Sequence, residues 1–252
     1  MDKTFNEVLL ELEKGNLRSA LKIDGVWVTQ TKVKEKILEA FKNGQLAEFK
    51  MGEQTFIDKH TLLPQEFNLD RGIRLVPGGS SVRRGAYLGK GVIVMPPSYI
   101  NVGAFVDEST MVDSHVLVGS CAQIGKRVHL SAGVQIGGVL EPIGANPVII
   151  EDDAFIGAGC IVVEGIIVEE KAVLAPSVTL SKSIPIYDLV NECEIKNGII
   201  PKNAIVVPGN RPISTKHTWG TQLGLGLKCA VIVKYRDEKS QESLNLESLL
   251  RD

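Results

Sequence analysis

The sequence predicts an all-β-dominated fold, a left-handed parallel β-helix made of hexapeptide repeats, and three observations support this prediction. An aliphatic residue recurs at every sixth position along most of the chain, and a small or aliphatic residue often lies two positions before it. Glycine, aspartate or asparagine often follows it. A period of six does not match an α-helix, and it is typical of a β-helix in which each repeat is one short strand and a corner. The spacing does not determine handedness; prisms of this kind are left-handed, an exception to the right-handed crossover rule.

We call the recurring aliphatic residue the core position of its repeat. The core positions are Val76, Val82, Leu88, Val94, Ile100, Val106, Val112, Val118, Ile124, Leu130 and Ile136, then Ile150, Ile156, Val162, Val168, Leu174, Leu180 and Ile186, and finally Ile200 and Val206. Side chains two apart on a strand share a face, so the residue two before each core position also points inward. If three repeats form one triangular coil, residues eighteen apart stack at about 4.8 Å, and about six coils give a prism about 30 Å tall.

The residue after each core position is expected to form the corner. Gly89, Asn101 and Asp107 are examples, and their residue types tolerate the positive φ that a sharp corner can need. Two interruptions, at 139–149 and 187–199, shift the phase of the repeat. Each is expected to be a loop that leaves the prism, and such loops often carry binding residues.

The flanks predict three parts: an α-rich N-terminal domain at 1–72, the β-helix at 73–212 with its two loops, and a short C-terminal β/α cap at 213–252. In the N-terminal part, Thr4 and Glu7 form a capping box before an apolar helical stripe, and Asp24-Gly25 predicts a hairpin turn. A second helix is expected to end at Asn43-Gly44. This part is expected to cover the end of the prism as a small cap. In the C-terminal part, we expect a strand at 228–236 and a helix at 243–251.

The composition excludes several classes of function. The chain has 252 residues, with 28 Lys and Arg against 30 Asp and Glu, so no nucleic-acid or membrane surface is implied. The N-terminus carries no apolar signal region, and there is no apolar stretch long enough to span a bilayer, so a cytoplasmic protein is expected. The four cysteines lack C-x-x-C spacing, and Cys121 and Cys160 fall inside the repeat, which favours packed thiols over a metal site or a disulfide.

Two sequence runs are far more specific than the repeat. Residues 118–126 read VGSCAQIGK and residues 136–142 read IGGVLEP, within matching runs that extend from about Gly72 to Gly209. These runs resemble the tetrahydrodipicolinate N-succinyltransferase family. The resemblance implies a homotrimeric left-handed β-helix enzyme of lysine and diaminopimelate biosynthesis. It would move succinyl from succinyl-CoA, a co-substrate, to the amine of ring-opened tetrahydrodipicolinate, giving N-succinyl-2-amino-6-oxopimelate. No tightly bound cofactor or metal is implied.

The resemblance also assigns residues. Asp113, in Met111-Val112-Asp113, matches the family's substrate-binding aspartate and would hold the amine and accept its proton, which makes it the expected catalytic residue. Arg74 matches the family's substrate-binding arginine and would bind a carboxylate of the dianionic acceptor. The simpler interpretations are that Asp113 caps a corner, as Asp107 could, and that Arg74 is a surface charge.

Further candidates have weaker support. Glu141, in the first loop, is a substrate-binding candidate that could equally be a solvated acid. Ser120, Cys121 and Gly138 could line the groove for the coenzyme arm, although corner and core roles explain them too. His129 is a candidate general base, but a structural role at a corner is favoured for it.

One segment departs from the family pattern. Phe155-Ile156-Gly157-Ala158 should be followed by Arg-Ser-Glu-Val-Val-Glu-Gly, but here Gly159 replaces the arginine and Ile161 replaces the first glutamate, which is implicated in the substrate site. Isoleucine cannot accept a proton or hold an ammonium group. Either Asp113 suffices, or Glu141 or Glu164 substitutes, or the acceptor has changed.

Three other functions remain open. An N-acetyltransferase would use acetyl-CoA on the same or a related amino-dicarboxylate. A hydratase of the γ-carbonic-anhydrase type would need three histidines around zinc, and this chain has four histidines without a close pair. A non-catalytic hexapeptide scaffold is the third alternative, and the departure at Ile161 is the observation that keeps it open.

Overall fold

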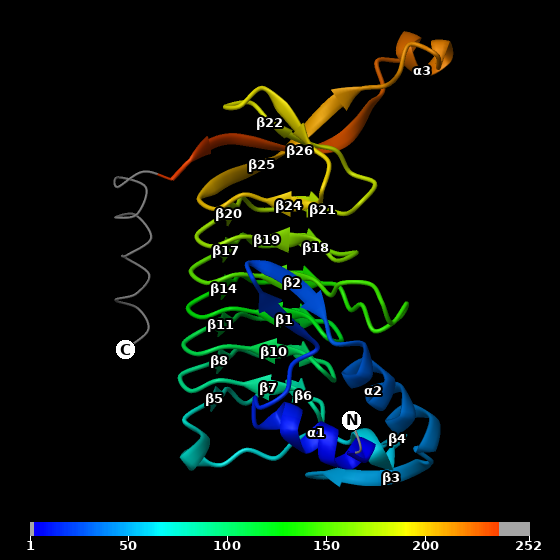
Figure 1. Cartoon of the computed structure of the whole chain (residues 1–252), viewed down its shortest axis with the longest axis vertical. Helices are drawn as coiled ribbons and strands as arrows, with labels where there is room; N and C mark the ends of the chain where they lie inside the picture. The colour runs from blue at the N-terminus through cyan, green and yellow to red at the C-terminus, as the bar shows by residue number, and fades with distance from the viewer. Residues whose placement is uncertain (1–2, 237–252) are drawn as a thin grey trace.

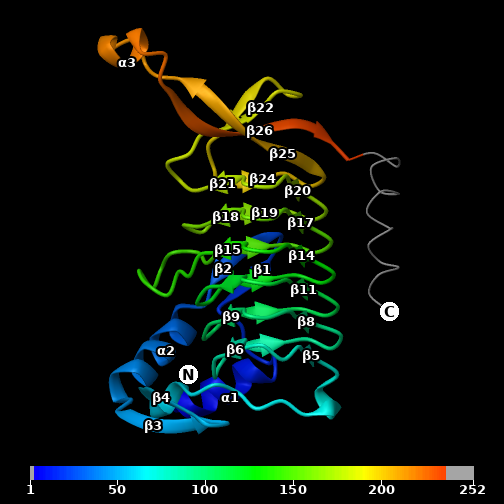
Figure 2. The ribbon, with the colours of Figure 1, turned by 180° about the vertical axis from the view of Figure 1, so that it is seen from behind.

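The computed structural model describes residues 3–236, in which short parallel strands wind into a three-sided β-helix. Figures 1 and 2 show its coils stacked along the long axis, with the N-terminal elements along one side and a hairpin at the far end. Each coil contributes one strand to each of three sheets, which we call faces 1, 2 and 3.

The strands of each face are two residues long within the coils. Face 1 contains β7 (Tyr87–Leu88), β10 (Phe105–Val106), β13 (Gln123–Ile124), β16 (Ile149–Ile150), β19 (Ile167–Val168) and β24 (Ile199–Ile200). Face 2 contains β5 (Arg74–Leu75), β8 (Ile93–Val94), β11 (Met111–Val112), β14 (His129–Leu130), β17 (Phe155–Ile156) and β20 (Val173–Leu174), and is extended by β25 (Ala204–Pro212), β26 (Gly226–Tyr235), β22 (Ile186–Asp188) and β23 (Cys193–Ile195). Face 3 contains β6 (Ser81–Val82), β9 (Tyr99–Ile100), β12 (Leu117–Val118), β15 (Gln135–Ile136), β18 (Ile161–Val162) and β21 (Thr179–Leu180).

The register confirms the stacking predicted from the repeat. Phe105 lies beside Gln123 on face 1, eighteen residues later, and Met111 lies beside His129 on face 2 with the same separation. The core positions from Val82 to Val206 are all buried. The residues two before them share this core, and Ser98 and Thr110 are polar members: the Thr110 hydroxyl, for example, donates to Gly125 O at 2.8 Å and accepts from Val128 N at 3.0 Å. The interior is therefore filled by one aliphatic side chain and one smaller side chain per repeat.

The first core position was predicted one residue too late. Leu75, not Val76, pairs with Val94, packs against the core and continues the stack. The segment between Leu75 and Val82 contains one residue more than a repeat, and Gly78 and Gly79 within it both have positive φ. This wider turn absorbs the extra residue.

The corner prediction was also wrong in its position. The left-handed residue is the third after the core position, as at Ser109, His115 and Cys121, with φ values of 59°, 61° and 67°. The residue directly after the core position is small for a different reason. A Cβ on Gly119 would overlap the backbone N of Gly138, because the next coil passes directly against it.

Aspartate and asparagine have another role directly after a core position. Their side chains accept a hydrogen bond from the next backbone N–H. Three pairs of this kind occur in the described residues: Asn101 with Val102, Asp107 with Glu108, and Asp113 with Ser114, at 2.7 to 2.8 Å. These residues therefore cap N–H groups at the corner without adopting a positive φ.

The first interruption is a loop, as predicted. It adds eight residues to a coil, because Gln123 pairs with Ile149 and not with the residue eighteen positions after it. The second interruption was expected to be a loop as well, but part of it is the antiparallel strand pair β22–β23, and β22 also pairs with β26. This part of the chain thus joins the C-terminal hairpin.

The N-terminal elements lie along the β-helix beside face 1 (Figures 1 and 2). They are α1 (Phe5–Glu13), β1 (Ala20–Ile23), β2 (Val26–Thr29), α2 (Thr31–Asn43), β3 (Leu46–Met51) and β4 (Gln54–Lys59), followed by the short helices η1 (His60–Leu62) and η2 (Leu69–Arg71). The Thr4–Glu7 capping box, the hairpin at Asp24-Gly25 and the helix end before Gly44 are confirmed. The hairpin β3–β4 was not predicted.

A second apolar cluster joins these helices to the β-helix. Leu9 of α1 and Ile37 of α2 are fully buried together with Val102 and Cys121 from two successive corners. The N-terminal part therefore packs against these corners of the prism.

The C-terminal strands β25 and β26 form a long antiparallel hairpin, and the short helix α3 (Thr218–Gln222) lies near its tip. Figure 1 shows this tip projecting away from the coils. The expected strand at 228–236 is confirmed, whereas the expected helix at 243–251 lies outside the described residues. Within residues 3–236, no helix is both long and apolar enough to cross a membrane.

Candidate functional site

Arg74 and Asp113 lie on the same face of the β-helix. Arg74 in β5 is beside Ile93, and Ile93 is beside Met111, two residues before Asp113. The two candidates are therefore two coils apart along face 2. Arg74 is exposed and Asp113 is half-buried. Arg74 directly precedes an inward-facing residue and Asp113 directly follows one, so both side chains point outward.

Asp113 does cap a corner of the β-helix. Its Oδ1 accepts from Ser114 N at 2.7 Å, and its backbone carbonyl accepts from the Ser98 hydroxyl at 2.7 Å. Asn101 makes the same side-chain contact with Val102 N at 2.8 Å. Within the described chain, Oδ2 of Asp113 has no hydrogen-bond partner, so one carboxylate oxygen remains for a ligand.

A shallow pocket of about 300 Å³ lies at this corner. Gly79 and Ser81, which follow Arg74 in the chain, form one part of its wall. His115 and Leu117, which follow Asp113, form another part. The structure therefore brings together the segments after Arg74 and Asp113, although neither of these side chains lines the pocket.

Ile161 borders the same region. It lies on face 3 beside Gln135, which lines the pocket, and its side chain is 39% exposed. Gly159 forms the preceding corner with a φ of 68°. The side chain of Ile161, where the family pattern has a glutamate, thus points outward and lies one coil from the pocket wall.

The two acids proposed as substitutes lie elsewhere. Glu164 accepts from Lys182 N at 2.8 Å and so caps a corner of the next coil. Glu141 is exposed on the first loop. Neither lines the pocket beside Ser98.

Ser120 and Gly138 lie together at adjacent corners. A Cβ on Gly138 would be 2.7 Å from Ser120 N, and Val139 N donates to Ser120 O at 3.1 Å. The preceding residues, Gly119 and Gly137, have no side chain to cap the next N–H, and in residues 3–236 the N–H groups of Ser120 and Gly138 have no hydrogen-bond acceptor. These two donors are available to a ligand.

The Cys121 side chain points the other way. It is fully buried against the N-terminal helices, and burial raises the pKa of its thiol. The thiol therefore faces α1 and α2 instead of an open groove. Burial also raises the pKa of Cys160, to about 11, so neither thiol is activated as a nucleophile.

His129 has a packing role in this structure. Its ring stacks on Phe155 of the next coil with ring centroids 4.9 Å apart, and the side chain is half-buried on face 2. Among the described residues, no three His, Cys, Asp or Glu side chains gather in a way that could hold a metal ion.

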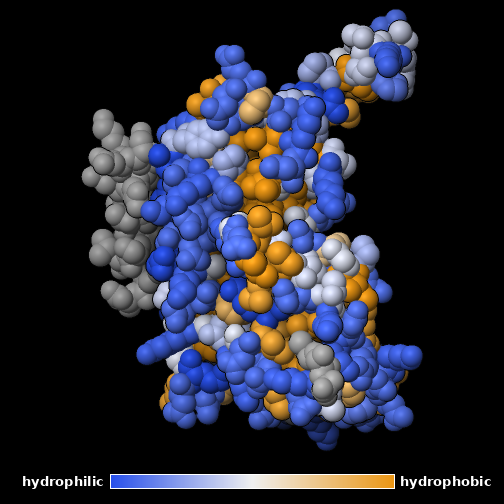
Figure 3. All heavy atoms as spheres, viewed as in Figure 1, coloured by the Kyte–Doolittle hydropathy of each residue, from blue (hydrophilic) through white to orange (hydrophobic). Residues whose placement is uncertain are grey.

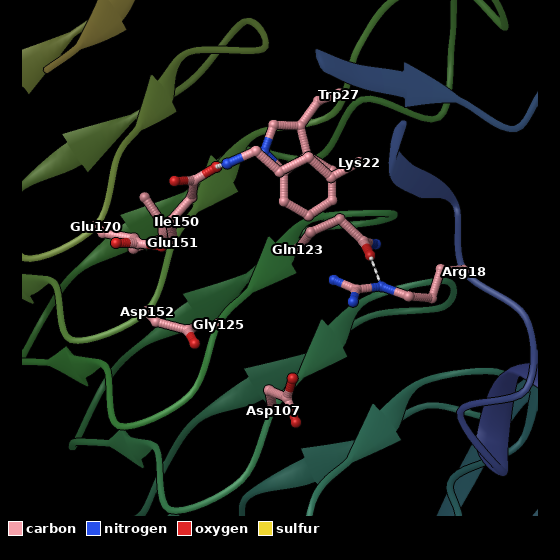
Figure 4. Close-up of a pocket in the computed structure, with 10 residues that line it drawn as sticks. All are labelled: Arg18, Lys22, Trp27, Asp107, Gln123, Gly125, Ile150, Glu151, Asp152 and Glu170. Atoms are coloured by element: carbon pink, nitrogen blue, oxygen red, sulfur yellow. Dashed lines mark hydrogen bonds and ion pairs between the residues drawn. The ribbon is translucent and has the colours of Figure 1, made fainter. Parts of the chain in front are cut away.

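A further pocket, of about 230 Å³, was not anticipated from the sequence (Figure 4). It lies between the β1–β2 hairpin and face 1, and is lined by Arg18, Lys22 and Trp27 from the N-terminal part. Asp107 and Asp152 from the coils are also in its wall. Nothing in the sequence around Arg18 indicates that it meets residues more than one hundred positions away.

Comparison with known proteins agrees with the fold and extends over the whole chain. The family model described as the hexapeptide repeat of succinyl-transferase matches residues 147–182. A protein of Sodalis glossinidius named 2,3,4,5-tetrahydropyridine-2,6-dicarboxylate N-succinyltransferase is 45% identical over 250 residues, covering 98% of this chain and 88% of its own length. A protein of the same name from Burkholderia mallei is 47% identical, and the match covers 96% of this chain and 86% of that protein. Another from Acinetobacter baylyi is 45% identical, and the match covers 99% of this chain and 89% of that protein. Identity at this level over nearly the full length shows that the chain belongs to the 2,3,4,5-tetrahydropyridine-2,6-dicarboxylate N-succinyltransferase family.

Proposed function

We propose that the protein transfers the succinyl group of succinyl-CoA to the amine of ring-opened 2,3,4,5-tetrahydropyridine-2,6-dicarboxylate, in lysine and diaminopimelate biosynthesis. The observation that carries this proposal is the near full-length identity to relatives of that name. In the reaction, the amine nitrogen forms a bond to the thioester carbonyl and the carbon–sulfur bond breaks. The amine loses a proton, and the coenzyme leaves with a free thiol.

Asp113 is the proposed catalytic residue. Its free carboxylate oxygen would hold the acceptor amine and take its proton, while the other oxygen stays bound to Ser114 N. The cap holds one carboxylate oxygen at the corner beside Ser98, which orients the free oxygen. Orientation of this kind supplies part of the rate enhancement.

Arg74 is the proposed carboxylate-binding residue. A guanidinium presents a rigid fork of donors that suits a carboxylate, and Arg74 is exposed on the same face as Asp113. The distance of two coils, about 10 Å along the stack, suits an acceptor with charged groups at both ends of a carbon chain. Glu141 remains a proposed substrate contact, from the first loop.

The coenzyme arm is proposed to lie along the corners at Ser120 and Gly138. Their two uncapped N–H groups are suitable donors for an amide carbonyl of the arm or for the oxyanion of the tetrahedral intermediate. Cys121 would support this corner indirectly: its side chain is buried under the N-terminal helices, its N–H donates to Val102 O and its carbonyl accepts from Gln123 Nε2.

We also propose a left-handed β-helix and a homotrimer with the groove between neighbouring prisms. Apolar side chains that a single chain leaves exposed support the trimer. Figure 3 shows apolar residues exposed along the coils and on the C-terminal hairpin in this view. Two apolar side chains near the tip of this hairpin are exposed: Trp219 at 72% and Leu223 at 55%.

The experiment that tests the acceptor site is kinetic. Arg74→Ala should raise KM for the acceptor and leave KM for succinyl-CoA nearly unchanged, since a lost charge-assisted contact costs about 1.5–3 kcal/mol of binding. Arg84→Ala, which removes an arginine that lies 3.6 Å from Glu13, is the control for loss of a surface charge. Equal loss of affinity for both substrates would count against a carboxylate-binding role.

A further inference from the structure

The pocket between the β1–β2 hairpin and face 1 has the geometry of a ligand site (Figure 4). Its volume of about 230 Å³ is below the ~300 Å³ at which pockets for drug-sized molecules begin. A nucleotide or a coenzyme is therefore too large, and a small metabolite fits. The charges in its wall then decide which kind of metabolite.

Arg18 presents an oriented guanidinium to this pocket. Its Nε donates to Gln123 Oε1 at 2.9 Å, and its central carbon lies 3.7 Å from the centroid of the Phe105 ring. Gln123 is 1% exposed and is held in turn, since its Nε2 donates to Cys121 O at 2.9 Å. The two contacts fix the plane of the guanidinium.

The outer edge of this guanidinium is open. Figure 4 shows its two Nη atoms directed away from Gln123 and into the pocket. Neither makes a hydrogen bond or an ion pair with any residue between 3 and 236. A pair of parallel N–H donors on a stacked arginine is a fork for one carboxylate.

Two carboxylates share the pocket with Arg18. Asp107 Oδ1 accepts from Glu108 N at 2.8 Å, and Asp152 Oδ1 accepts from Lys126 N at 2.9 Å. In the described part of the chain, the second oxygen of each has no hydrogen-bond donor. Burial lowers the pKa of Arg18 and the charges of these two aspartates act against that effect, which agrees with their closeness to it.

The remaining charges in the wall are already paired. Lys22 Nζ and Trp27 Nε1 both donate to Glu151 Oε1 at 2.7 Å, and Glu170 is paired with Lys202. The pocket therefore offers one open cationic fork and two half-satisfied carboxylates. A simple anion would be repelled by the aspartates, and a simple cation would be repelled by Arg18. A molecule with both charges satisfies both groups.

We propose that this pocket binds a free α-amino acid. The carboxylate of the ligand lies against the two Nη groups of Arg18, and its ammonium group lies against Asp107 and Asp152. Its side chain extends along Trp27, the apolar part of the wall. The site is on face 1, whereas Arg74 and Asp113 are on face 2, so it is separate from the proposed acceptor site.

Isothermal titration calorimetry on the full-length protein, without either substrate, tests this proposal. The probes are glycine, L-alanine, L-valine and L-lysine, with propionate and n-propylamine as ligands that carry one charge only. At least one amino acid should bind saturably, and propionate and n-propylamine should each bind at least about tenfold more weakly. Absence of binding for all four amino acids would overturn the proposal, as would equal binding of either single-charge probe.

Variants locate the binding. Arg18→Met should abolish it, and Asp107→Asn should weaken it at least about tenfold. Glu108→Gln is the matched control and should leave it unchanged, because the neighbouring Glu108 carboxylate contacts Lys126 at 3.0 Å. If Arg18→Met does not fold, as judged by circular dichroism, Arg18→Lys keeps the charge without the fork and should still weaken binding.

Arg74→Ala separates this proposal from the proposed function. Amino-acid binding should survive that change, because Arg74 lies on another face. Loss of binding in Arg74→Ala with retention in Arg18→Met would assign the amino acid to the acceptor site and contradict a separate pocket.

Discussion

Asp113 has a corner role and a proposed catalytic role, and a single substitution can separate them. Asn101 makes the corner contact with a side-chain amide, so Asp113→Asn should keep the cap and the fold. An amide cannot take the proton of the acceptor amine, so kcat/KM should fall by about 10²–10⁴ while the thermal midpoint stays close to that of the wild type. Steady-state kinetics and thermal denaturation measure the two quantities. Turnover near the wild-type level would refute the assignment and direct attention to Glu141 and Glu164.

Ile161 provides the companion test. A side chain that is 39% exposed can be replaced by glutamate without burying a charge, so Ile161→Glu should leave activity equal or higher. If the added carboxylate takes over the proton, the double variant with Asp113→Asn should recover part of the lost rate. A double variant no faster than Asp113→Asn would show that this position does not reach the acceptor.

Lys34 is a buried cation that ties α2 to the first loop. Its Nζ donates to Ala145 O at 2.6 Å, and burial lowers its pKa. Between the lowered pKa and the ordinary value of about 10.4, the unfolded chain binds more protons than the folded one, so the free energy of unfolding rises with pH. The difference in thermal midpoint between wild type and Lys34→Met should therefore shift in favour of wild type as the pH rises through that range. A difference independent of pH would contradict a lowered pKa.

At the scale of the element, close contact between coils limits which residues a corner accepts. Gly119→Ala would drive a Cβ into the backbone N of Gly138, which no side-chain movement can relieve. We expect a loss of about 1–3 kcal/mol in the free energy of unfolding, measured by urea denaturation. Gly144→Ala is the control, because a Cβ there meets no atom within 4 Å, and it should change stability by less than about 0.5 kcal/mol. Equal effects of the two changes would contradict the packing argument.

The sequence was sufficient to predict the coils because each repeat must fill the same narrow interior. An error came where that rule is relaxed, at Leu75 and Val76, since the wide turn through Gly78 and Gly79 hides the phase. The hairpin β3–β4 was missed because its strands are largely exposed, so no buried apolar side chains mark an inward face in the sequence.

The site was predictable only in part. Arg74 and Asp113 could be named because short runs around them resemble the family, but their separation by two coils follows from the register. The pocket at Arg18 depends on a contact with Gln123 across 105 positions, which no local pattern encodes. Likewise, the direction of the Cys121 side chain depends on helices that pack from outside the repeat.

At the scale of the whole molecule, a single chain leaves apolar surface that a homotrimer would cover. Sedimentation equilibrium at micromolar concentration should give three times the chain mass of 27.3 kDa. Trp219→Ser and Leu223→Ser together, on the projecting hairpin, should weaken the assembly if that hairpin contacts a neighbouring copy. A fully active monomer would contradict the proposed groove between prisms.

The central claim is the identity of the transferred group and its acceptor, and one assay tests it most directly. Purified protein is given succinyl-CoA or acetyl-CoA, with or without 2,3,4,5-tetrahydropyridine-2,6-dicarboxylate, and release of free thiol is followed while mass spectrometry identifies the product. We expect thiol release that requires the acceptor, a preference of at least about tenfold in kcat/KM for succinyl-CoA, and a product that has gained one succinyl group. A preference for acetyl-CoA, or no thiol release with either donor, would contradict the account.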